Sequence, residues 1–296
     1  MSMVVLTNDD GIDSPGLWAL AEALGDLCDL AVIAPLHNQS AVSHSITLRR
    51  ALEVHERSVP GAGAAWAVDG TPADCVRLAT LGLAGDELAL IVSGANLGLN
   101  LGDDIAYSGT AAAAMEAAFN GLPAIAVSQQ TTERELGFPR SDRYDFELAQ
   151  LFVRRLVEII LDPAAGLDQV MLGREESTGA DSDVDAALTG AAMLNVNVPG
   201  ISPADAQGVR ITQPCRRFYR DDFEEHPARD GVRSFRVYGH EPMHCERPDT
   251  DAVAVRDGYV SVTPVRQRFD DAPLRERLQV LHGLHWHEHV EGAGRP

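Results

Sequence analysis

The chain has 296 residues, 45% of them hydrophobic, and a formal net charge of −20. This content suffices for a sizeable buried core, whereas the acidic balance argues against a nucleic-acid scaffold, because binding a polyanion needs a basic field. No window approaches the apolar run of a membrane span, and the N-terminus lacks a signal-peptide pattern. We therefore expect a cytoplasmic location and no membrane partner.

All 24 basic residues are Arg. The absence of Lys from the sequence excludes the lysine of a nucleotide-binding P-loop and Schiff-base chemistry. The four cysteines are widely spaced, with no CxxC pair: Cys28, Cys75, Cys215 and Cys245. This spacing predicts neither a zinc site nor a disulfide framework, so we interpret them as reduced thiols.

The first half of the chain alternates strand and helix patterns. Residues 3–8 form a short apolar strand, and Ser14 with Pro15 opens a helix that ends at Gly25. Further strands are predicted at 29–35, 51–56, 64–70, 88–96 and 124–128, with helices from Thr71 to about Leu81 and from about Ser108 to Gly121. This alternation predicts an α/β, Rossmann-like fold with a doubly wound, mostly parallel sheet.

The second half is less regular. Residues 147–161 form a strongly amphipathic helix, and residues 173–190 are acidic and rich in small residues, which is typical of a loop. Strands are predicted at 193–200, 209–214, 234–239 and 258–265, before a tail that is helical and then His-rich. We divide the chain into a core with the site (1–132), a helix and acidic insertion (133–192), a completion of the core with a β-rich arm (193–267) and a C-terminal helix with a His-rich tail (268–296).

Oxygen-rich loops follow three of the predicted strands. Asp9 and Asp10 follow the first, residues 38–40 follow the second, and Asn96 ends the strand at 88–96. Ligands of an open parallel sheet bind beyond the carboxyl ends of its strands, where the winding direction reverses. Adjacent carboxylates repel and favour a compensating cation, although Asn, Asp and Gly are also the residues of a solvated turn. An all-oxygen donor set suits Mg²⁺, Mn²⁺ or Ca²⁺ rather than zinc.

A glycine-rich loop at 94–102 leads from Asn96 towards the predicted helix near Ser108. Its glycines let backbone amides approach a ligand, and a helix N-terminus favours an anion. We therefore expect phosphate contacts from Asn100, Ser108, Gly109 and Thr110. Asp103 and Asp104 fit either the site or a solvated loop.

Several stretches resemble the SurE survival-protein nucleotidases, and together they span most of the chain in the family's order. They are "TNDDGIDSPG", "GTPADCV", "VSGANLGLNLGDDIAYSGTAAAAMEAAFNGLPAIAVS", "LNVNVP" and "DTDAVAVRDGYVSVTPV", with "AP" and "NQS" at 34–40. The resemblance implies that Asp9, Asp10, Ser40 and Asn96 bind one divalent cation per subunit, Mg²⁺ or Mn²⁺, with Ca²⁺ as an option in a crystal.

The resemblance also implies a metal-dependent phosphomonoesterase, a 5′-nucleotidase acting on nucleoside 5′- and 3′-monophosphates, with short polyphosphate as a further candidate substrate. Asp9 or Asp10 would also orient or deprotonate the attacking water. The resemblance further implies a homodimer or homotetramer with an exchanged C-terminal segment. We expect the strands at 234–239 and 258–265 to lie outside the first sheet. Residues 133–192 and the tail are longer than the family pattern, which leaves substrate range and assembly open.

Other interpretations of the sequence compete with this one. A non-catalytic nucleotide or metal sensor on the same scaffold is the main alternative, and only turnover separates the two. The "NDDG" stretch also resembles the DxDG start of haloacid dehalogenase-type phosphatases, but its carboxylates are adjacent rather than alternate. "HWHEH" at 285–289 matches an HxxEH zinc pattern without room for a supporting fold. We assign structural roles to Asp74, Asp249 and Asp251, and neither His37 nor His44 is identified as a general acid.

Overall fold

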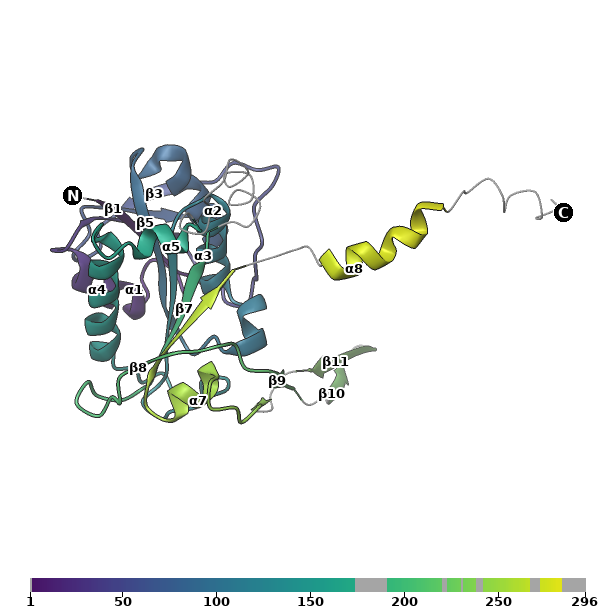
Figure 1. Ribbon diagram of the computed structural model, residues 1–296. Coiled ribbons are helices and arrows are strands. Elements are labelled where there is room, and N and C mark those ends of the chain that lie inside the picture. Colours follow the sequence, from purple (N-terminus) through teal and green to yellow (C-terminus); the bar gives the residue numbers. More distant parts are fainter. Residues whose placement is uncertain are drawn as a thin grey trace. The chain divides into compact units, whose positions relative to one another are not determined.

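A nine-stranded sheet forms the centre of the chain in the computed structural model, which describes residues 2–173, 191–219, 223–229, 231–237, 242–266 and 272–283 (Figure 1). Its strand order is β3-β4-β2-β1-β5-β6-β7-β13-β8. The strands are β1 (Met3–Thr7), β2 (Asp29–Pro35), β3 (Val54–Arg57), β4 (Ala64–Val68), β5 (Leu88–Leu97), β6 (Ala124–Gln129), β7 (Met193–Val198), β8 (Val209–Ile211) and β13 (Val260–Val265).

Most neighbouring strands in this sheet are parallel. Only β3 with β4 and β13 with β7 pair antiparallel. From β1 the chain winds outwards through β2 to β4 on one side and through β5, β6 and β7 on the other. The predicted α/β class with a doubly wound, mostly parallel sheet is confirmed.

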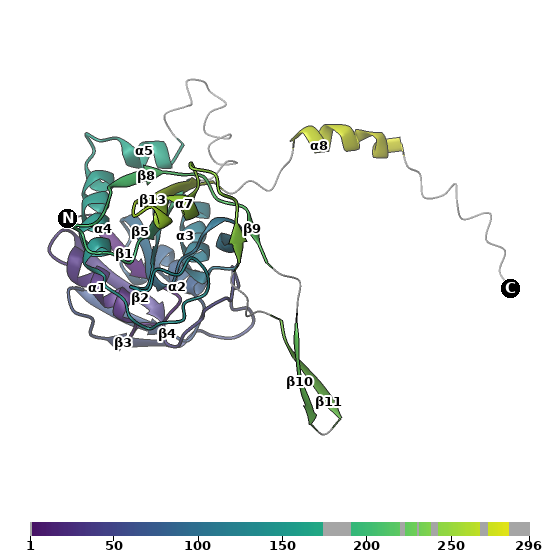
Figure 2. The ribbon, with the colours of Figure 1, turned by 90° about the horizontal axis from the view of Figure 1, so that it is seen from below.

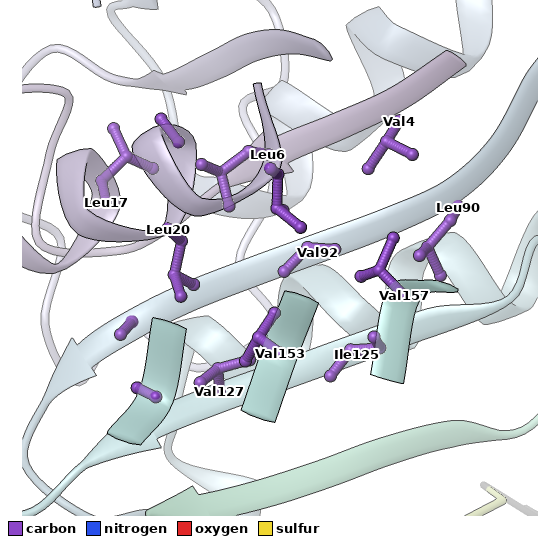
Figure 3. Close-up of a cluster of buried hydrophobic side chains, with 14 of the residues drawn as sticks. Val4, Leu6, Leu17, Leu20, Leu90, Val92, Ile125, Val127, Val153 and Val157 are labelled. Atoms are coloured by element: carbon purple, nitrogen blue, oxygen red, sulfur yellow. The ribbon is translucent and has the colours of Figure 1, made fainter. Parts of the chain in front are cut away.

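Helices cover both faces of the sheet. On one face lie α1 (Pro15–Leu24) and α4 (Glu147–Leu161), and on the other lie α2 (Pro72–Leu78) and α3 (Gly109–Phe119) (Figures 1 and 2). Alternate residues of β1 enter the two cores. Val4 and Leu6 pack with α1 and α4 (Figure 3), whereas Val5 packs on the opposite side. Burial on both faces explains why these strands are continuous apolar runs.

The helix starts follow from local chemistry. Ser14 precedes Pro15, which takes the first helical position of α1, where its missing N–H costs nothing. Thr71 and Asp74 form a reciprocal capping box at α2: the Asp74 carboxylate accepts the Thr71 N–H at 2.9 Å. Asp74 also accepts the Thr47 N–H at 3.0 Å. Asp74 thus has the structural role expected from its position.

The expectation that residues 258–265 lie outside the first sheet is wrong. β13 lies between β7 and β8 within it, and Val260 and Val262 are buried. The alternating Ser261 and Thr263 are buried as well, and their hydroxyls bond the Thr212 hydroxyl at 2.8 and 2.7 Å. Side-chain hydrogen bonds therefore let a half-polar strand occupy a fully covered position.

Smaller elements complete the described residues. The predicted strand at 234–239 corresponds to β11 (Val232–Arg236), which pairs with β10 (Glu224–Arg229) in a separate hairpin (Figure 2). The others are η1 (Ala79–Leu83), η2 (Gly102–Ala106), α5 (Leu167–Met171), α7 (Asp251–Arg256), and β9 (Arg217–Phe218) paired with β12 (Met243–His244).

Residues 267–296 form a second unit, in which α8 (Ala272–Arg277) and η3 (Leu278–Gly283) are described. Nearly all of the acidic 173–190 stretch and the whole of the 285–289 motif lie outside the described residues. No helix within the described ranges is long and apolar enough to cross a membrane.

Candidate active site

The predicted site residues gather where the winding of the sheet reverses. β1 lies between β2 and β5, from which the chain continues in opposite directions. Asp9 and Asp10 follow β1, and Asn96 lies at the carboxyl end of β5. This corner is where a doubly wound sheet leaves room for a ligand.

The loop after β1 is a closed turn. The Asn8 amide donates to the Gly11 carbonyl at 2.9 Å, and its oxygen accepts the Gly11 N–H at 3.2 Å. Gly11 has φ +101°, a conformation that L side chains rarely adopt. The turn therefore holds the two carboxylates between Asn8 and Gly11 in a fixed backbone.

Asp9 is only 3% exposed, so it is not part of a solvated turn. One of its oxygens accepts the Thr110 hydroxyl, and an added Cβ at Gly109 would lie 2.7 Å from the Asp9 Cβ. The first turn of α3 thus packs directly against this carboxylate. Burial raises the pKa of Asp9, while bonds from Thr110 and the Gly109 N–H partly oppose the rise.

Asp10 joins the end of β5 to the loop after β2. Its Oδ2 accepts the Leu97 N–H at 3.0 Å, and its Oδ1 accepts the Asn38 amide at 3.4 Å. Burial, followed by repulsion from the charge of Asp9, raises the pKa of Asp10 from 3.8 to about 6. The acidic pair therefore carries negative charge that this fold does not favour.

Ser40 and Asn96 are held near the same corner by backbone contacts. The Gln39 N–H donates to the Asp9 carbonyl at 2.6 Å, and the Ser40 N–H donates to the Asn38 side-chain oxygen at 2.9 Å. The Asn96 amide nitrogen donates to the Gly98 carbonyl at 2.8 Å, which leaves its oxygen available as an acceptor. The three loops with the four predicted ligands are thus tied together, with the exposed Ser40 at the outer edge.

The donor set fits a hard divalent cation. Within the described ranges, neither Asp9 nor Asp10 has a cationic side chain as an ion-pair partner, and the pKa values of both carboxyl groups are raised. No group of three or more His, Cys, Asp or Glu side chains that could hold a metal occurs there either. Two carboxylates with neutral Ser and Asn oxygens are typical ligands of Mg²⁺ or Mn²⁺. Metal binding itself stays a prediction.

The four predicted phosphate contacts differ in their surroundings. Gly109 and Thr110 begin α3 beside Asp9, and the Ser108 oxygen caps that helix by accepting the Ala111 N–H at 3.0 Å. Asn100 is buried, and its amide donates to the Ser128 hydroxyl at 2.8 Å. The first N–H groups of α3 are taken by Asp9 and Ser108, so the helix start favours an anion through its dipole.

Two buried asparagines of β7 were not predicted as part of this site. The Asn195 and Asn197 amides donate to the Asn100 carbonyl at 2.9 and 3.1 Å, and the Asn197 oxygen accepts the Asn100 N–H at 2.9 Å. Polar residues repeated in the apolar run "MLNVNV" were the available signal, because buried amides require partners. They fix the middle of the glycine-rich loop.

The C-terminal third also holds this loop. Asp251, fully buried, accepts the Gly102 N–H at 2.7 Å and the Cys215 N–H at 2.9 Å, so its role extends beyond the local turn expected for it. Asp103 accepts the Arg217 N–H at 3.1 Å, and Asp104 pairs with the Arg217 guanidinium at 3.0 Å. Asp103 and Asp104, whose roles the sequence left open, thus anchor the loop to the segment around Arg217.

Tyr144 is a further residue near the acidic pair that the sequence analysis missed. Burial, and next the charge of Asp10, raise its pKa to about 12. Its ring stacks on Phe146, with centroids 5.9 Å apart. The position of Tyr144 in the longer 133–192 region gave no motif from which to find it. His44 instead bonds Glu116 at 2.8 Å and stacks on Phe119, and no general acid is assigned.

Comparisons with known proteins identify the family of this chain. Residues 4–221 match the family model described as survival protein SurE. The chain is 40% identical to the 5′-nucleotidase SurE of Chloroflexus aggregans, covering 96% of this chain and 99% of that protein. It is 38% identical to the 5′-nucleotidase SurE of Rubrobacter xylanophilus, covering 92% and 95%. The crystal structure of the Aquifex aeolicus SurE protein superposes with a TM-score of 0.71 at 30% identity, covering 95% of this chain and 99% of that one. This chain therefore belongs to the SurE family.

Proposed function

We propose that this chain is a 5′-nucleotidase that hydrolyses nucleoside 5′-monophosphates to nucleoside and phosphate, with one divalent cation per subunit. The observation that carries the proposal is the acidic pair of Asp9 and Asp10 packed against the first turn of α3 at the switch point of the sheet. An anion-binding helix start beside a cation site is suited to a phosphate ester. The names of the Chloroflexus and Rubrobacter relatives support the same activity.

In this proposal Asp9, Asp10, Ser40 and Asn96 hold Mg²⁺ or Mn²⁺. When bound, the cation would supply charge stabilisation for the phosphoryl group and an acidified water. Thr110 orients Asp9 through its hydroxyl, and the positive end of the α3 dipole favours phosphate oxygens beside it. Of the two carboxylates, Asp10 is the more exposed, and we assign it the orientation of the attacking water.

The same site is proposed to accept 3′-monophosphates and short polyphosphate. The features assigned to the phosphate are the start of α3, a serine and the cation ligands. None of them distinguishes a 5′ from a 3′ ester. Contacts of this kind recognise a phosphate whatever its substituent. Preference among these substrates would then depend on parts of the site that contact the nucleoside.

Phosphate release from a substrate panel tests this function. The chain would be incubated with AMP, 3′-AMP, ribose 5-phosphate and tripolyphosphate, after exhaustive chelation and again with added Mg²⁺ or Mn²⁺. We expect no release without metal and restored release with it. Binding of AMP without release under every metal condition would favour the sensor, and release that persists at negligible metal content would contradict the metal site.

We further propose a homodimer or homotetramer assembled through the β10–β11 hairpin. Among the described strands, β10 and β11 pair only with each other. The segment exposes Phe223, Val232 and Phe235, which would be costly to leave in water on an isolated arm. Exchange of such an arm between identical chains would bury them. A cytoplasmic location also stays a prediction.

A further inference from the structure

We propose that Phe138 and Tyr219 form a stacking surface for the base of the nucleotide. This inference rests on the proposed function and adds to it a subsite that selects nucleotides over other phosphate esters. The two rings lie 6.3 Å apart between centroids, inclined by 43°. Phe138 is 52% exposed and Tyr219 is 36% exposed, so ring surface remains open on both. Exposed aromatic rings bind bases through their π faces.

A shared buried anchor fixes the two rings. The Arg217 side chain is only 3% exposed, and its guanidinium pairs with Asp104 at 3.0 Å. The same guanidinium donates to the Leu136 carbonyl at 2.9 Å, two residues before Phe138. Tyr219, two residues after Arg217, donates its hydroxyl to Asp104. One arginine therefore organises both segments, which limits the entropy lost when a ligand stacks.

This surface borders the loop that joins the cation site to the phosphate site. Pro139, next to Phe138, packs on Gly98: a Cβ added there would lie 2.9 Å from Pro139 Cγ and 3.9 Å from the Asn96 amide nitrogen. Asp104, which holds Tyr219, belongs to η2, shortly before α3. The rings are thus attached to the same connection whose ends carry Asn96 and the α3 start. A phosphate held at that helix start would leave its nucleoside to extend over this connection.

Two other pairs of Phe and Tyr rings in the described residues fit this role less well. Tyr144 and Phe146 stack, but Phe146 packs against the core, and its ring lies 3.3 Å from the Cβ position of Gly16. Phe223 and Phe235 belong to the hairpin segment, whose strands pair in a separate sheet. The open Phe138–Tyr219 pair is therefore the one placed to receive a base.

Stacking predicts a particular specificity. Every nucleobase offers a π face, and the pair contributes no hydrogen-bonding edge except the Tyr219 hydroxyl, which Asp104 already engages. Discrimination among bases should be small. Discrimination between a nucleotide and the same sugar phosphate without a base should be large.

The kinetics of Phe138→Ala on AMP and on ribose 5-phosphate, both with Mg²⁺, test the subsite. Loss of one stacking ring should raise KM for AMP about 5- to 100-fold, with ribose 5-phosphate changed less than about twofold. Phe138→Trp should restore KM for AMP, because it retains a stacking face. The matched control is Leu151→Ala, which removes an exposed apolar side chain from α4 and should leave both substrates unchanged. Thermal unfolding checks that each variant is folded.

Calorimetric binding of AMP to metal-free wild type and Phe138→Ala separates the subsite from catalysis. Tighter binding by the wild type supports stacking even if no substrate is hydrolysed, in which case only the proposed function has failed. An unchanged KM and affinity for AMP in Phe138→Ala, while wild type releases phosphate, would overturn the subsite and leave the function intact. An equal loss on both substrates would also overturn it, because the ring would then only support the loop.

Discussion

Neutralising Asp10 should stabilise the metal-free protein while removing its activity. Asp10→Asn keeps the size of the side chain and one oxygen that can accept the Leu97 N–H, but it removes a negative charge beside Asp9. A bound cation favours that charge, whereas the metal-free fold disfavours it. The substitution should therefore raise the stability of the metal-free protein and lower the activity of the metal-bound protein. Turnover should fall roughly 100-fold, as for the loss of other electrostatic catalytic groups.

The magnitude follows from the pKa of Asp10, which rises from 3.8 to about 6 on folding. Each pKa unit corresponds to about 1.4 kcal/mol, so the ionised carboxylate costs the metal-free fold at most about 3 kcal/mol. Water screens a partly exposed group, and we expect about 1–2 kcal/mol. For a chain of this size, that raises Tm by about 2–6 °C.

The effect should depend on pH in a defined direction. Because the folded-state pKa exceeds the unfolded value of 3.8, the folded protein binds more protons between the two values. The stability contribution of a protonated Asp10 is complete below about pH 4 and is lost as the pH rises through about 6. The advantage of Asp10→Asn should therefore be absent near pH 4 and complete near pH 7.5.

Thermal unfolding of chelated wild type and Asp10→Asn from pH 4 to 8 measures this difference, with the exposed Asp13→Asn as a control in the same loop. Added Mg²⁺ should raise the Tm of the wild type more than that of the variant, because only the wild type keeps the full ligand set. An Asp10→Asn protein that is less stable than wild type at pH 7.5 without metal, or a Tm difference independent of pH, would refute the reasoning.

Three further predictions concern the support of the site and its assembly. Gly109→Ala places a Cβ 2.7 Å from the Asp9 Cβ, so we expect turnover to fall at least tenfold. The control is Gly63→Ala, whose added Cβ meets only the Leu30 carbonyl at 3.5 Å and should leave turnover unchanged. Equal activities of the two variants would show that α3 does not abut the site. Asp251→Ala leaves the Gly102 and Cys215 N–H groups without their buried acceptor, and urea unfolding should show a loss of about 2–5 kcal/mol, against less than about 0.5 kcal/mol for the exposed Asp249→Ala. Light scattering over a wide range of protein concentration should give a dimer or tetramer, and a variant with residues 224–236 replaced by a short glycine linker should be monomeric; a monomeric wild type would refute the arm.

Local patterns were sufficient to predict the first half of the fold and the corner that carries the candidate site. The strand at 3–8 and the start of the 109–119 helix depend on residues a few positions apart, and Asp9 follows from the rule that ligands meet strand ends. The position of β13 depends instead on the Thr212 hydroxyl, which satisfies Ser261 and Thr263 from a distant part of the chain. Periodicity carries no information on such partners.

The same limit applies to the surroundings of the site. The sequence predicted only a local turn role for Asp251. Its carboxylate instead accepts the N–H of Gly102, 149 positions earlier in the chain, and a contact over that separation leaves no local pattern. Tyr144 and Phe138 lie in a region that matches no motif, and their neighbours Asp10 and Tyr219 become apparent only in three dimensions. Short stretches were thus sufficient to propose candidate ligands, whereas the scaffold that surrounds those residues could not be predicted from them.

The anchoring of the glycine-rich loop by late residues has a consequence for synthesis of the protein. All four proposed metal ligands lie within the first 96 residues, yet Gly102 is held by Asp251, and Asp104 by Arg217. During synthesis, the four proposed ligands would leave the ribosome long before Arg217 and Asp251, which hold the loop in place. The emerging chain would thus carry all four proposed ligands on an unsecured loop, and the candidate site would become rigid only when the last strands close the sheet.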